Sequence, residues 1–166
     1  MRTSLKIGLV IAALLVAAMG YYAISPLFRN IHADDPLPTA ASGSPEATST
    51  PAAMPEAAEP VIGAEPAPVT GTFAHPASGT VRIVEAGGER YVRYENYKTI
   101  NGPDIFVYLA TDKDAKEFVN LGSVKATEGN INYEIPADVD LSKYHYVLTW
   151  CRMFSVLFNS ADLAAD

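Results

Sequence analysis

The sequence predicts an all-β fold, an antiparallel β-sandwich of seven or eight short strands, preceded by one transmembrane helix and a disordered linker. Three observations lead to this prediction. Residues 7–24 carry no charge, residues 32–69 are rich in alanine and proline, and from residue 70 onward short β-branched and aromatic runs alternate with turn residues. The 166-residue chain therefore divides into segments 1–31, 32–69 and 70–166.

The first segment predicts a membrane anchor, with a helix over about residues 7–28. A helix built from the 18 uncharged residues is about 27 Å long, close to the hydrocarbon thickness of a bilayer. Arg2 and Lys6 precede the run, and the positive-inside rule keeps them in the cytoplasm and exports the rest of the chain. The alternative is a signal peptide with a small-x-small cleavage site at Ala18-Met19-Gly20. Both alternatives place the C-terminal domain outside the cytoplasm, in the periplasm or at the cell surface.

The second segment, residues 32–69, predicts a disordered Ala/Pro-rich spacer. It holds eight of the twelve prolines and six acidic residues but no Lys or Arg, and no apolar residue recurs at a helical or strand period. Such a segment buries too little apolar surface to offset the entropy of ordering it. We expect a tether that holds the domain away from the membrane.

The third segment alternates strand and turn signals. Its predicted strands cover residues 80–84, 90–94, 105–109, 121–124, 131–135 and two parts of 144–158. The first two flank residues 85–89, which contain a Gly-Gly pair, and predict a hairpin. The run 105–109 is apolar almost throughout, which predicts a strand buried on both faces. The run 144–158 is too long for one ordinary strand, so we expect a tight turn near Arg152.

The composition excludes several classes of function. A net charge of −7 argues against nucleic-acid binding, because such binding depends on basic groups that neutralise phosphates. A single cysteine excludes an internal disulfide, a four-cysteine iron–sulfur cluster and a C-x-x-C motif, including the one that attaches haem. No zinc spacing occurs, and Asp112-x-Asp114 lacks the glycine and the distal glutamate of a calcium loop. We therefore predict no metal and no cofactor.

Cys151 is the residue with the most distinctive chemistry and the candidate redox thiol. An accessible thiolate could form a sulfenate or a mixed disulfide with a partner, and Arg152 beside it would favour the thiolate. Alternatively, a cysteine next to Trp150 in an apolar strand is a small buried hydrophobe, or it joins two chains in a disulfide. His145 would lie about 20 Å away along a straight strand, whereas His75 could approach from another strand.

Motifs in the third segment resemble those of a known family. They are Gly71-x-Phe73, Gly102-Pro103-Asp104, Val107-Tyr108-Leu109, Leu121-Gly122, Gly129, Tyr133-x-Ile135-Pro136, and Trp150-Cys151 followed by Phe154 and Phe158. In order and spacing they resemble the DM-thirteen or electron-transfer DM domain family, found beside DOMON domains in Skeletor-type surface proteins and in bacterial membrane-anchored proteins. The resemblance covers essentially the whole third segment. It implies a β-sandwich, and a redox-active cysteine has been proposed for the family.

The sequence leaves two functions open. The first is an accessory redox or electron-transfer module at the membrane, with Cys151 as its working group and a redox protein as its partner. The second is a non-catalytic module that binds a cell-surface protein or glycan through an aromatic face, with Cys151 in the core. That face would draw on Tyr91, Tyr94, Tyr97, Tyr108, Tyr133, Tyr144, Tyr146 and Trp150, which cross-strand packing also explains. No nucleophile–base–acid set points to an independent enzyme.

Overall fold

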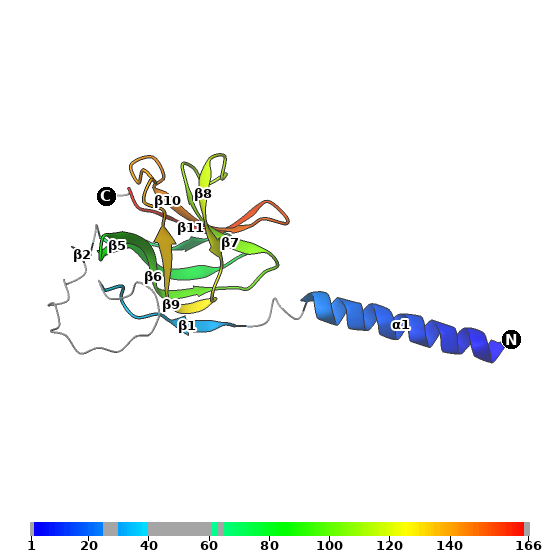
Figure 1. The fold of residues 1–166 in the computed structure, drawn as a ribbon. Helices are drawn as coiled ribbons and strands as arrows, with labels where there is room; N and C mark the ends of the chain where they lie inside the picture. Colours follow the sequence, from blue (N-terminus) through cyan, green and yellow to red (C-terminus); the bar gives the residue numbers. More distant parts are fainter. Residues whose placement is uncertain (1, 25–29, 40–60, 63–64, 165–166) are drawn as a thin grey trace, which may run out of the picture.

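The computed structural model describes residues 2–24, 30–39, 61–62 and 65–164. Within these residues one helix, α1 (Arg2–Ile24), precedes a series of strands (Figure 1). The strands are β1 (His32–Asp34), β2 (Val61–Ile62), β3 (Ala67–Pro68), β4 (Thr70–Gly71), β5 (Ala77–Ala86), β6 (Glu89–Thr99), β7 (Ile105–Ala110), β8 (Phe118–Ser123), β9 (Glu128–Ile135), β10 (Tyr146–Cys151) and β11 (Val156–Asp162). From residue 70 to residue 164 this gives β4 to β11, as many strands as the sequence predicts.

The strands form two sheets that pack as a sandwich. One sheet has the order β1-β9-β6-β5-β2, with β3 also paired to β5, and the other has the order β4-β11-β10-β7-β8. In the described part of the chain the pairs are antiparallel, except for the parallel pair of β1 and β9. Side chains from both sheets form the core between them, among them Val92 and Tyr94 of β6 and Val107 and Leu109 of β7. The predicted all-β sandwich is confirmed.

The predicted buried strand at 105–109 is confirmed as well. Val107 and Leu109 point into the core between the sheets, whereas Tyr108 belongs to a second buried cluster together with Leu148. Successive residues of a strand point to opposite faces, so β7 is covered on both sides.

The hairpin of β5 and β6 is longer than the sequence pattern indicates. Ala86 pairs directly with Glu89, and Gly87 and Gly88 form the turn with φ values of +63° and +84°. A two-residue turn with positive φ at both positions matches the twist of antiparallel strands, and glycine adopts it without steric penalty. Glu85, Ala86 and Glu89, which were expected in the turn, therefore belong to strands β5 and β6.

The long run 144–158 divides near Arg152, as predicted. β10 ends at Cys151, β11 begins at Val156, and these two residues pair across the turn 152–155. Ser155 adopts a positive φ of 51° in this turn. β10 lies between β11 and β7 in its sheet, so Cys151 is at the end of a central strand.

The two ends of the predicted spacer belong to a sheet, which corrects the disorder expected over residues 32–69. β1 pairs with β9, while β2 and β3 pair with β5. β1 and β2 lie at opposite edges of that sheet. The sequence pattern misses these strands because each is only two or three residues long, too short to show an alternation of apolar and polar residues. Residues 40–60, the centre of the predicted spacer, lie outside the described residues.

Helix α1 begins earlier than predicted and covers residues 2–24. Several of its apolar side chains are exposed, including Val10, Leu14, Leu15, Val16 and Met19. In the part of the chain that the structure describes, no helix is long and apolar enough to cross a membrane. The transmembrane character expected of this segment is therefore not supported by the structure.

Candidate functional site

Cys151 is buried at the C-terminal end of β10. Only 1% of its surface is exposed, and its side chain packs with Ile105 of β7 and Phe158 of β11. The thiol donates a hydrogen bond to the backbone oxygen of Pro103, with an Sγ–O distance of 3.2 Å. The sequence did not decide whether this thiol is accessible to solvent, and the structure shows that it is buried.

The loop of residues 101–104 provides this cover. A Cβ on Gly102 would lie 2.6 Å from Cζ of Phe158, so the loop approaches the aromatic ring at a distance that only glycine permits. Asp104 adopts a positive φ of 54°, which costs a non-glycine residue about 1 kcal/mol or more. The turn expected at Gly102-Pro103-Asp104 is present, and it brings the acceptor for the Cys151 thiol into place.

Arg152 and Asp104 join this loop to the turn that follows β10. The Nε and Nη2 atoms of Arg152 donate to the two carboxylate oxygens of Asp104 at 3.0 and 2.9 Å, and the Arg152 amide donates to the Asp104 carbonyl at 3.0 Å. The guanidinium also lies over the ring of Phe106, 4.3 Å from its centroid. Hydrogen bonding to Asp104 raises the pKa of Arg152. The cation that was expected to favour a thiolate at Cys151 is therefore paired with Asp104.

The two histidines considered near the thiol have other partners. His75 stacks on Phe158 with a centroid distance of 3.8 Å and an interplanar angle of 19°, and its Nδ1 lies 3.0 Å from Thr72 Oγ1. His145 lies next to the other end of β10, where its Nδ1 is 2.8 Å from Asp162 Oδ1. Phe158 packs against both His75 and Cys151. His75 therefore lies close to Cys151, as considered from the sequence, but the ring that it contacts is that of Phe158.

The model of one protein family, described as electron transfer DM13, matches residues 71–163. The match covers more than half of the chain and includes Cys151 with the loop and turn around it. The chain belongs to the electron transfer DM13 family. No curated protein and no solved structure matches the chain.

The aromatic residues considered for a binding face are divided between the interior and the surface. Tyr146 and Trp150 are partly exposed and pack with Tyr108 on the side of β7 and β10 that faces away from the other sheet. Tyr94, Tyr97, Tyr108 and Tyr133 are buried. The rings of Tyr94 and Tyr97 lie 4.4 Å apart, and the Tyr97 hydroxyl lies 2.9 Å from Thr149 Oγ1 and accepts a hydrogen bond from Asn159 at 3.0 Å. Burial raises the pKa of Tyr94 and Tyr97, so both stay protonated near neutral pH. These rings pack the core, as cross-strand packing predicts.

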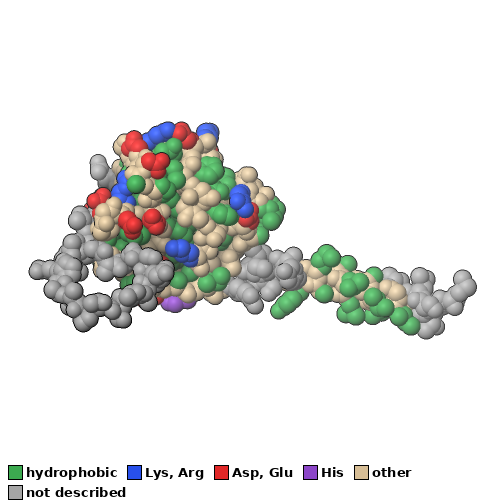
Figure 2. Space-filling model, viewed as in Figure 1, with side chains coloured by type: hydrophobic (Ala, Val, Ile, Leu, Met, Phe, Trp, Pro, Cys, Tyr) green, Lys and Arg blue, Asp and Glu red, His purple; other side chains and the backbone are tan. Residues whose placement is uncertain are grey.

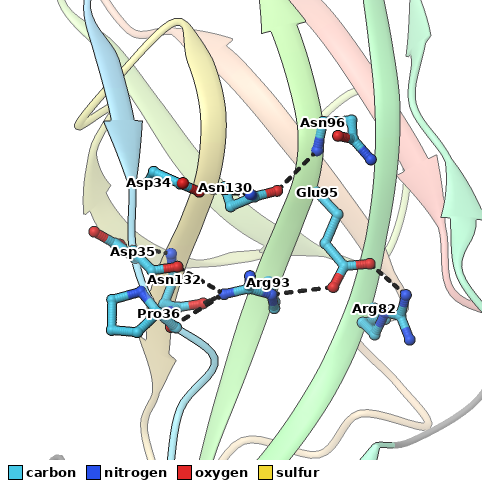
Figure 3. A network of polar contacts seen from close by, with 9 residues as sticks. All are labelled: Asp34, Asp35, Pro36, Arg82, Arg93, Glu95, Asn96, Asn130 and Asn132. Carbon is cyan, nitrogen blue, oxygen red and sulfur yellow. Dashed lines mark hydrogen bonds and ion pairs between the residues drawn. The ribbon is translucent and has the colours of Figure 1, made fainter.

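A polar network on the outer surface of the β1-containing sheet was not found from the sequence (Figure 3). Arg93, a buried cation of β6, donates to Glu95 at 3.1 Å and to Asn132 at 2.9 Å. It also donates to the backbone oxygens of Asp35 and Pro36, each at 3.2 Å. The network therefore holds the chain that follows β1 against the sheet. Carbonyl acceptors have no sequence signature, which is why the pattern of residues gave no indication of it.

No metal site is found in the parts of the DM13 chain that the structure covers. There, no three His, Cys, Asp or Glu side chains cluster as a metal ion would require. The Asp112-x-Asp114 pair forms a charged turn, in which Asp112 accepts from the Asp114 amide at 2.9 Å and Lys116 bonds Asp114 at 3.0 Å.

Proposed function

We propose that this chain is an accessory redox module in which Cys151 acts as a gated thiol. The observation that carries the proposal is the family match, because the family is described as electron transfer and the matched residues include the single thiol of the chain. The module would act on a redox partner and would not work as an independent enzyme.

The gate consists of the loop 101–104 and the turn 152–155. The Arg152–Asp104 pair that joins them lies at the surface, with Arg152 more exposed than Asp104, so water can replace its hydrogen bonds when the two segments separate. A thiol is a weak hydrogen-bond donor, so its bond to Pro103 adds little. Positive φ values at Asp104 and Ser155 strain both segments. A local opening at this end of β10 therefore costs less than unfolding of the domain.

The chemistry available to the opened site is thiol–disulfide exchange. The Cys151 thiol loses its proton to solvent, and the thiolate attacks one sulfur of a disulfide on the partner. A bond forms between that sulfur and Sγ, the partner's disulfide bond breaks, and the second partner sulfur leaves as a thiolate. Because the chain has no second cysteine, a thiol of a partner must resolve the mixed disulfide.

We extend the proposal to location. The 18 residues 7–24 are uncharged and follow Arg2 and Lys6, and the apolar side chains described on α1 are largely exposed. This pattern supports a single-pass anchor with the DM13 domain exported to the periplasm or cell surface. Resistance of the full chain to alkaline carbonate extraction from membranes tests the anchor, and release into the supernatant would contradict it.

A second candidate function is supported by the burial of Cys151. A cysteine that is 1% exposed and packed among Ile105 and Phe158 fits a structural role, and the domain would then bind a cell-surface protein or glycan without redox chemistry. Among the described side chains of the DM13 domain, the most exposed aromatic residues available to such binding are Phe73, Phe118 and Phe154.

One experiment separates the two functions. The full chain is mixed with an aromatic disulfide whose released thiolate absorbs visible light, and the release is followed without denaturant. The redox proposal predicts one equivalent of released thiolate and a mixed disulfide at Cys151, and a Cys151→Ala chain as control should release none. No release from the native chain, with one equivalent after denaturation, would contradict the redox proposal and favour the binding module.

A further inference from the structure

The end of the domain at which Cys151 lies also carries its most exposed apolar side chains. Phe73 is fully exposed, Phe154 is 65% exposed and Met153 is 62% exposed. Phe73 follows β4, which pairs with β11, and the amide of Thr72 donates to the Phe158 carbonyl at 3.1 Å. The segment around Phe73 and the turn 152–155 are therefore neighbours, and we call them together the apolar tip.

The apolar tip is almost free of charge, unlike the rest of the domain. Residues 70–166 contain 13 acidic and 9 basic residues. In contrast, the segments 70–78, 99–104 and 151–158 together contain one acid, Asp104, and one base, Arg152, which neutralise each other. On the side of the domain from which α1 extends, Figure 2 shows hydrophobic side chains (green) next to basic (blue) and acidic (red) ones.

The N-terminal helix joins the domain at the same end. Ile31 is fixed to the sheet, since its amide donates to Thr127 Oγ1 at 2.9 Å and its carbonyl accepts from the Thr127 amide at 2.7 Å. Asn30 lines one surface pocket together with Pro76, which is close to Phe73 in the chain, and with Lys98 and Glu128, which form an ion pair. The hairpin of β10 and β11 points to the side of the domain from which α1 leaves (Figure 1).

The link between α1 and the domain is short. Ile24 ends the helix, and Asn30 is six residues further along the chain. Six residues span at most about 22 Å even when fully extended. Because β1 is part of the sheet, the chain between the helix and the domain is much shorter than the 38-residue tether (residues 32–69) expected from the sequence. The tip therefore stays close to the end of the helix.

We infer that the apolar tip, Phe73 with Met153 and Phe154, contacts a lipid surface and enters its interfacial layer. The inference rests on the proposed membrane anchor. The short link brings the tip to the bilayer, aromatic side chains favour the interface between water and lipid, and the tip presents no unpaired acid to anionic headgroups. The opposite end of the domain carries exposed charged residues of both signs, among them the ion pairs Lys116–Asp114 and Lys143–Glu117, and these favour contact with water.

The inferred orientation also defines the direction of access to Cys151. Arg152 and Met153 follow the cysteine directly, so a tip at the interface places the gate next to the lipid surface. The partner of the thiol would then be a membrane protein or another molecule held at that surface.

Depth-dependent quenching of tryptophan tests the inference in the full chain, reconstituted into phosphatidylcholine–phosphatidylglycerol vesicles with lipids brominated near the headgroup. The probe variant is Phe154→Trp and the matched control is Phe118→Trp, both combined with Trp150→Phe. Phe118 is also an exposed aromatic residue, at 45%, and it begins β8 opposite Ala110, at the other end of the sheet. If Trp150→Phe does not fold, the same two variants are compared with Trp150 retained.

The inference predicts that the tryptophan at position 154 shifts to shorter emission wavelength and loses intensity in brominated vesicles, while the tryptophan at position 118 does neither. Emission at position 154 that matches position 118, in a chain that still resists carbonate extraction, would overturn the inference and leave the anchor standing. Release of the chain by carbonate would overturn the anchor and this inference with it.

Discussion

The guanidinium of Arg152 and the carboxylate of Asp104 form two hydrogen bonds, of 2.9 and 3.0 Å, that join the turn after β10 to the loop before β7. The first of these residues follows Cys151, and the second follows Pro103, whose carbonyl accepts the thiol hydrogen bond. Each partner of the ion pair is thus the direct chain neighbour of one partner of the thiol hydrogen bond. In our account it holds the gate of the redox site.

Removing this ion pair should speed modification of Cys151. Arg152→Gln removes an ion pair that has two hydrogen bonds, and this should raise the rate of reaction with a disulfide reagent about two- to five-fold. The matched control is Lys116→Gln, which removes an exposed ion pair to Asp114 far along the chain from the gate. If the wild-type chain, Arg152→Gln and Lys116→Gln all reacted at the same rate, the Arg152–Asp104 pair would not limit access of the reagent to Cys151.

Truncation of the thiol should destabilise the domain. Cys151→Ala leaves a small cavity among Ile105 and Phe158, and we expect it to lower the free energy of unfolding by about 1–2 kcal/mol in urea. Cys151→Ser keeps a hydrogen-bond donor for the Pro103 carbonyl, but it places a polar hydroxyl in the apolar surroundings of Ile105 and Phe158. An unchanged midpoint for Cys151→Ala would contradict the close packing of the sulfur.

Gly129 should be essential for the attachment of β1. A Cβ at this position would lie 1.8 Å from the backbone oxygen of Ala33, and φ is +114°. Gly129→Ala should therefore detach β1 and remove hydrogen-exchange protection at the Asp35 amide, which donates to Asn130 at 2.8 Å. Gly122→Ala is a close control, because φ there is +115° but nothing lies within 4 Å of the added Cβ.

The two alanine variants share a backbone strain of about 1–3 kcal/mol. Only Gly129→Ala adds a collision with β1. Equal loss of stability in both variants, with protection of the Asp35 amide retained, would contradict the docking of β1 on β9.

Acidification should destabilise the contact between His75 and Phe158. Burial lowers the pKa of His75 below the ordinary value of 6.5. As the pH falls through about 6.5, the unfolded chain therefore binds more protons at this residue than the folded chain, and the free energy of unfolding decreases.

His75→Phe keeps an aromatic ring on Phe158 and removes the proton site. Between about pH 7.5 and pH 5.5 the wild-type chain should lose more stability in urea titrations than this variant. The same slope in both chains would show that His75 does not contribute to the pH dependence.

Much of the fold follows from local patterns in the sequence. The strand 105–109 is recognisable from its apolar residues, and the break near Arg152 follows from the limited length of strands. The longer extent of the first hairpin depends on two consecutive positive φ values at Gly87 and Gly88, which a Gly-Gly pair permits but does not require.

The features missed from the sequence are contacts between distant segments. Residues 35 and 36 look like part of a disordered spacer, yet their carbonyls accept from Arg93, 58 and 57 residues further along the chain. Likewise, the sequence identifies Cys151 as the candidate thiol, but its cover depends on Pro103, 48 residues away. Backbone acceptors carry no side-chain identity, so no residue pattern reveals such pairs.

The most direct test of the gated thiol is the dependence of Cys151 modification on denaturant. The full chain is treated with a disulfide reagent at urea concentrations below the unfolding transition, and the rate is compared with the stability of the domain. Our account predicts a measurable rate without urea and a shallow dependence on urea, because a local opening exposes little surface. A rate that rises with the full slope of global unfolding would contradict it and identify Cys151 as a structural residue of the core.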